Sequence, residues 1–206
     1  MFTEIVSWAA VGLALAASAT ILINRDWRIL LGSLAIQYLA VFWLVTRHLP
    51  IAMGSVKLIA GWMSVAILGM TRLSHEALDQ GEQDRFFPRG AVFRILLIGI
   101  VILIAIGGTP RIESATPGMG LPVIAAGLLL IGAGIAHLGV TSDILRVIIG
   151  LLTMLSGFEI IYAAVESAIL VTGLLAVVTL GLGVIGAYLQ IAGSVPLVDS
   201  DTEDIV

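Results

Sequence analysis

The chain has 206 residues, of which 59% are hydrophobic and only 12% are charged, with a net charge of −4 and no cysteine. A soluble domain of this length could not cover so much apolar surface with so few charged groups. The lack of cysteine excludes a disulfide framework, a thiolate nucleophile and a Cys-ligated cluster. The composition therefore predicts an integral membrane protein with no soluble domain large enough to fold alone.

Seven apolar stretches follow one another along the chain, and their lengths decide which kind of membrane protein to expect. Barrel strands would be roughly 9–11 residues long with strict alternation, whereas a spanning helix needs about 20 apolar residues. We therefore predict an all-α, polytopic transmembrane helix bundle. The expected spans cover residues 4–23, 28–45, 51–70, 92–108, 121–140, 144–165 and 167–191.

The positions of Lys and Arg predict how the chain is oriented, since both favour the cytoplasmic side of short loops. With the N-terminus outside, the cytoplasmic positions hold Arg25, Arg28, Arg72, Arg85, Arg89, Arg94 and Arg146, against Arg47, Lys57 and Arg111 outside. This bias favours a C-terminus in the cytoplasm, and we expect the chain to lie in a bacterial or archaeal cytoplasmic membrane. We expect the acidic tail at 194–206 to be disordered.

Two segments of the chain resemble each other and predict a tandem repeat. Arg28-Ile-Leu-Leu-Gly32 and Arg146-Val-Ile-Ile-Gly150 open the second and sixth spans, and each follows an acidic residue. Ser55-Val-Lys-Leu-Ile-Ala-Gly61 likewise aligns with Ser167-Ala-Ile-Leu-Val-Thr-Gly173. We predict a three-helix unit at 1–71, a charged loop, connector helix and linker at 72–117, and a second three-helix unit at 118–193. Because a single helix connects the two units, the second unit enters the membrane from the same side as the first, and both have the same orientation.

Glu159 is the sharpest functional candidate, because an ionisable side chain costs at least roughly 2.5–3.5 kcal/mol at mid-bilayer. It lies deep in the outer half of the sixth span, where burial favours its neutral form and allows it to exchange a proton. Ser156 and Tyr162, one turn away on either side, are expected hydrogen-bond partners. The alternative is a glutamate that only ties helices together.

Glu166 and Lys57 complete the set of proton-path candidates with Glu159 and Tyr162. Glu166 lies either on the same helical face as Glu159 or in the loop after the sixth span. Lys57 either snorkels out of the third span or pairs with one of the two glutamates. A Lys–Glu pair in a low dielectric is a component of proton paths.

The opening of the sixth span resembles a known family of membrane subunits. Arg146-Val-Ile-Ile-Gly-Leu-Leu-Thr-Met-Leu-Ser156 is similar to the pattern Arg-x-Leu-Ile-Gly-Leu-Glu-Leu-Met-Leu-Asn in the second helix of the K-type subunit of complex I. Glu166-Ser-Ala-Ile169 is similar to the Glu-Ala-Ala-Ile of that family's third helix. The family also includes the E component of hydrogenase-4-type complexes, whose double-triplet layout is closer to this chain, and the C-type subunit of multisubunit cation/proton antiporters.

The resemblance implies a membrane-arm subunit with glutamates along a proton path between larger antiporter-like subunits. The chain departs from the pattern at the family glutamate, which falls on Leu34 and Leu152. We expect a subunit of a proton-translocating or cation/proton antiporter complex. Two alternatives remain: a structural or assembly subunit, and a stand-alone small-solute transporter.

No sequence motif points to an enzyme. The chain lacks a Walker loop, a dinucleotide glycine fingerprint, an HExxH motif and paired histidines at haem spacing, and it has no basic patch for nucleic acid. We therefore expect a chain that is not catalytic by itself and that binds neither cofactor nor metal, with other membrane subunits and the lipid bilayer as its partners.

Overall fold

The computed structural model describes residues 2–76, 90–166 and 168–193, which form seven α-helices. Each helix is long and apolar enough to cross a membrane. The chain is therefore a multi-pass membrane protein folded as a seven-span helical bundle, as predicted. The helices are α1 (Phe2–Ile23), α2 (Trp27–Val45), α3 (Ile51–Glu76), α4 (Ala91–Ala115), α5 (Leu121–Leu138), α6 (Ile144–Val165) and α7 (Ile169–Ala192).

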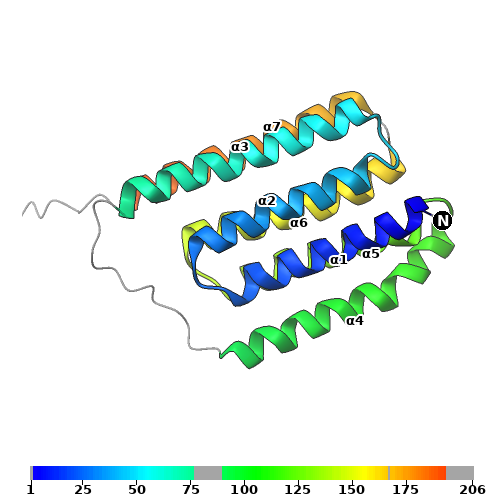
Figure 1. Ribbon diagram of the computed structural model, residues 1–206, viewed down its shortest axis with the longest axis horizontal. Coiled ribbons are helices and arrows are strands. Elements are labelled where there is room, and N and C mark those ends of the chain that lie inside the picture. Colours follow the sequence, from blue (N-terminus) through cyan, green and yellow to red (C-terminus); the bar gives the residue numbers. More distant parts are fainter. Residues whose placement is uncertain (1, 77–89, 167, 194–206) are drawn as a thin grey trace, which may run out of the picture.

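The helices form two layers of three with α4 at one edge (Figure 1). One layer holds α1, α2 and α3, and the other holds α5, α6 and α7, so that α1 packs on α5, α2 on α6 and α3 on α7. Helix α4 packs mainly on α5. As a result α6 is the most buried helix and α4 the least.

The bundle has two ends, which we name by the chain itself. The N-terminal side is where α1 begins, where α6 ends and where the loops at 46–50 and 116–120 lie. The C-terminal side is where α7 ends and where the loops at 24–26 and 139–143 lie. Helices α1, α3, α5 and α7 all run from the N-terminal to the C-terminal side (Figure 1). Each helix of the first layer is thus parallel to the helix it faces in the second.

Two helices extend beyond the spans predicted for them. Helix α3 continues to Glu76, and α4 continues through Pro110 to Ala115. Proline removes one backbone N–H from a helix, yet membrane helices tolerate it because nearby hydroxyls and neighbouring helices satisfy the freed groups. The Ile106 carbonyl is the one that Pro110 leaves without an amide partner, and the Thr109 hydroxyl donates to the preceding carbonyl, that of Ala105, at 2.6 Å. The charged loop at 77–89 and the acidic tail lie outside the described residues.

The acidic residues that precede the two similar spans have the same role. Asp26 caps α2 by accepting a hydrogen bond from the Arg28 N–H, and Asp143 caps α6 by accepting one from the Arg146 N–H. Such N-caps satisfy amide groups that a helix leaves unpaired in its first turn. The arginines differ, because Arg28 is exposed whereas Arg146 is buried. The Arg146 guanidinium donates to the Asn24 and Arg25 carbonyls, which ties α6 to the end of α1.

The aligned glycines of the two units differ in packing. Gly61 lies against the ring of Tyr38, whereas Gly173, its counterpart, has open space where a Cβ would point. Conversely Gly150 lies close to His137, and Gly32 is open. Equivalent positions therefore face a helix in one unit and open surroundings in the other. The tandem repeat itself stays a prediction.

Helices α5 and α6 make the closest approach, which depends on glycine. A Cβ on Gly157 would lie 2.7 Å from the Gly127 carbonyl oxygen and 2.7 Å from the Ile131 nitrogen. Small residues let membrane helices approach until their backbones touch, which gives the van der Waals contact that holds them together in lipid. The bundle's most extensive helix pair is therefore fixed by backbone contact.

We predict that Gly157→Ala destabilises the bundle by about 1–3 kcal/mol, because the added methyl overlaps backbone atoms that cannot move aside. Unfolding in mixed detergent micelles, followed by circular dichroism, measures the change. Gly181→Ala is the matched control, since a Cβ there meets nothing within 4 Å. Equal stability of the two variants would show that the α5–α6 contact is looser than described.

Candidate functional site

Four helices enclose the candidate site. In cross-section α2, α3, α7 and α6 form a square, because α2 packs on α3, α3 on α7, α7 on α6 and α6 on α2. Helices α3 and α6 stand on one diagonal of this square, and α2 and α7 on the other (Figure 1). Each of the four helices contributes polar side chains to the interior.

An ion pair crosses the diagonal between α3 and α6. Lys57 Nζ lies 3.0 Å from Glu159 Oε1, and the two side chains are only 4% and 2% exposed. Of the two behaviours that the sequence allowed for Lys57, the structure has the pairing, and the partner is Glu159. A long lysine side chain can bridge two helices that do not stand side by side.

The pairing follows from the cost of burying charge. A single ion moved into a low-dielectric interior costs several kcal/mol even after relaxation, so buried charges need a partner with good geometry. In a membrane span the surroundings outside the bundle are lipid, which offers none. Lys57 and Glu159 therefore depend on each other, and the pair holds α3 and α6 at a fixed spacing.

Helix α7 supplies the second partner of Glu159. The Thr179 hydroxyl lies 3.5 Å from Glu159 Oε1 and also donates to the Leu175 carbonyl at 3.0 Å. The Ser64 hydroxyl in turn lies 3.0 Å from the Thr179 carbonyl oxygen and joins α3 to α7. Gly183 allows this approach, since a Cβ there would lie 2.8 Å from the Ser64 Cβ.

Helix α2 brings Tyr38 to the same place. The phenol is 2% exposed, and its hydroxyl has no hydrogen-bond partner among the described residues. Its ring lies against Gly61, where a Cβ would come within 2.5 Å of ring carbons. The ring is therefore held in place by α3. Tyr38 is thus a buried proton donor beside the ion pair.

The other sequence candidates lie away from the pair. Tyr162 is half-buried and stacks on Phe158, with ring centroids 6.0 Å apart. Ser156 donates to the Leu152 carbonyl at 2.8 Å, so its hydroxyl proton is not directed at Glu159. Glu166 is the exposed C-cap of α6. Of the two positions open to it, Glu166 therefore occupies the helix end beside the loop.

The candidates predicted from the sequence include neither Thr179 nor Tyr38. The available signal was spacing. On α3, Lys57 and Ser64 are seven residues apart, and on α7 the same spacing separates Thr172 from Thr179. Seven residues are about two helical turns, so the two members of each pair lie on the same face of their helix. A polar stripe on a membrane helix indicates the face that looks into the protein.

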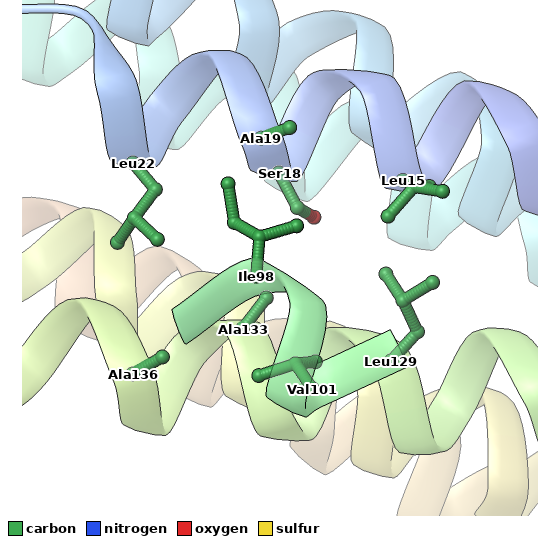
Figure 2. A pocket seen from close by; sticks show the side chains of 9 residues that line it. All are labelled: Leu15, Ser18, Ala19, Leu22, Ile98, Val101, Leu129, Ala133 and Ala136. Carbon is green, nitrogen blue, oxygen red and sulfur yellow. The ribbon is translucent and has the colours of Figure 1, made fainter. Parts of the chain in front are cut away.

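An apolar cleft lies elsewhere in the bundle, between α1, α4 and α5 (Figure 2). Its hydroxyl comes from Ser18, which also lies 3.4 Å from Gln37 Oε1. The cleft has no ionisable group, so it offers no acid–base chemistry. Its lining residues are Leu15, Ser18, Ala19, Leu22, Ile98, Val101, Leu129, Ala133 and Ala136.

Within the described residues, no group of three or more His, Asp or Glu side chains could hold a metal ion. The polar interior therefore offers a carboxylate, an ammonium, a phenol and hydroxyls, which are groups that exchange protons. Comparison of the chain with family models, curated proteins and solved structures finds no match.

We predict that Lys57→Met and Glu159→Gln each destabilise the bundle, by up to about 3–5 kcal/mol, because each leaves a buried charge without its partner. The double variant should regain most of that loss, since it removes both charges. Detergent unfolding of the four proteins gives the coupling free energy. Additive effects of the two single changes would show that the pair contributes nothing.

Proposed function

We propose that the chain is a membrane-embedded subunit of a proton-translocating or cation/proton antiporter assembly of the complex I-like or hydrogenase-4-like kind. The observation that supports the proposal best is the buried Lys57–Glu159 ion pair at membrane depth. Ionisable residues inside membrane spans are expensive and are typical of proton and ion pathways. The residue pattern that resembles the K-type subunit family supports the same class.

A proton can pass between the two members of the pair without a change of net charge. Lys57 gives the proton on Nζ to Glu159 Oε1 across 3.0 Å, which leaves a neutral amine beside a neutral carboxyl. The amine then takes a proton from one aqueous phase, and the new ammonium favours loss of the carboxyl proton toward the other. Each step moves one proton, and both resting states of the pair are neutral overall.

The partners and orientation belong to the same proposal. The C-terminal side carries Arg25, Arg28, Arg94 and Arg146, which favours a cytoplasmic location for that side. The partners would be larger antiporter-like membrane subunits that supply the driving force. Genes for fourteen-helix antiporter-like subunits beside the gene for this chain would support this partner class.

We predict that Glu159→Gln abolishes proton translocation while the chain still assembles with its partners, since the amide keeps the shape but carries no exchangeable acid. The test uses proteoliposomes containing the tagged chain and its co-purifying subunits, driven by an imposed membrane potential, with internal pH followed by a dye. Glu166→Gln is the matched control and should retain translocation, because Glu166 is exposed at the helix end.

Unchanged translocation by Glu159→Gln in an intact assembly would instead favour a structural or assembly subunit, in which the pair only fixes helix packing. Solute-dependent flux by the chain alone, with no co-purifying subunit, would favour a stand-alone transporter. The first outcome contradicts the proton role of Glu159, and the second contradicts the proposal that the chain works as a subunit of a larger assembly.

A further inference from the structure

The ion pair lies closer to one side of the bundle than to the other. Lys57 comes six residues after Ile51, and Glu159 six residues before Val165, so each is about 9 Å along its helix from the N-terminal side. From Glu159 to Ile144 the distance along α6 is about 22 Å. Protons reach the pair by a much shorter path from the N-terminal side.

The longer path is closed by hydrocarbon. Between the pair and the C-terminal side, the square of helices is filled by an apolar cluster that includes Leu30, Leu34, Leu68, Ile149 and Leu152, each 0% exposed. These side chains come from α2, α3 and α6, so the cluster closes the square from several helices. Apart from Tyr38, the buried members of this cluster are aliphatic, and the hydroxyls of Ser64 and Thr179 on this side of the pair donate to backbone carbonyls.

Helix α7 places a polar group beside Lys57. Helices α3 and α7 run parallel (Figure 1), and Ser64 contacts Thr179. Seven residues back along each helix, Lys57 is therefore level with Thr172. Thr172 is 1% exposed, and its hydroxyl has no hydrogen-bond partner among the described residues.

The polar groups around Lys57 have hydrogen-bonding capacity that a water molecule can satisfy. The Lys57 ammonium has three N–H groups, and its contact with Glu159 Oε1 at 3.0 Å engages one of them. A buried donor without an acceptor costs about 1–3 kcal/mol, and water in a polar site with several partners removes that cost. Thr172, Lys57 and Glu159 together provide the donors and acceptors that such water needs.

We propose that Lys57 and Glu159 exchange protons with the aqueous phase on the N-terminal side, past Thr172, and that the leucine and isoleucine cluster closes the C-terminal side. This inference adds a direction of access to the proposed proton role, and it rests on that proposed function. It makes the chain a half-channel, so that onward transfer requires a movement of the bundle or a partner subunit.

The chain suits a sidedness experiment because it has no cysteine. In Lys57→Cys, treatment with 2-aminoethyl methanethiosulfonate adds a side chain ending in an ammonium, which restores the charge facing Glu159. The reagent is applied to one side of sealed, oriented vesicles containing the intact assembly, with free cysteine as scavenger on the other. Proton translocation and the mass of the chain report the modification.

We expect modification from the N-terminal side to be at least about tenfold faster than from the C-terminal side, because a cation crosses the apolar cluster only at a high cost. Ser114→Cys and Ser142→Cys, both exposed, calibrate the N-terminal and C-terminal sides respectively. Leu68→Cys, inside the cluster, should stay unmodified from both. Thr172→Cys should also be modified from the N-terminal side, and it keeps the ion pair intact if Lys57→Cys fails to fold.

Equal rates from the two sides, faster modification from the C-terminal side, or none at either position would overturn the inference. The two proposals fail separately. Sided modification with unchanged translocation in Glu159→Gln would contradict the proton role and leave the access path in place. Lost translocation in Glu159→Gln with modification from the C-terminal side would contradict the access path alone.

Discussion

The buried ion pair between Lys57 and Glu159 is the constraint on which the rest of the bundle depends. Two opposite charges can be kept out of water only if they meet, and here they meet across the diagonal of four helices. That requirement fixes the spacing of α3 and α6. The other two helices bring Tyr38 and Thr179 close to the pair.

The interior of the four-helix square differs in polarity between the two sides of the bundle. Around Lys57 and Glu159 the interior is polar, and Gly61 on α3 leaves space there for the ring of Tyr38. Toward the C-terminal side the same square of helices is filled by tightly packed aliphatic side chains. In the proposed function the first region exchanges a proton and the second insulates it from the C-terminal side. A membrane protein that moves protons without leaking them needs both.

The fold was largely predictable from sequence, because hydrophobic length alone defines the spans. The ends of α3 and α4 were not, since their last turns are polar and one contains Pro110. For the site, burial cost singled out Glu159, but its partner depended on which helices face each other. Periodicity cannot settle that question, and so Thr179 was missed. The family pattern expects a carboxylate at Leu152, which instead lies in the apolar cluster.

Whether Glu159 changes its protonation state during transport is the central question, and infrared difference spectroscopy answers it most directly. During turnover of the intact assembly, we predict a carboxyl C=O stretching band that appears and decays with proton uptake and release. The band should be absent in Glu159→Gln and present in Glu166→Gln. A turning-over assembly that shows no carboxyl band sensitive to Glu159→Gln would contradict the account.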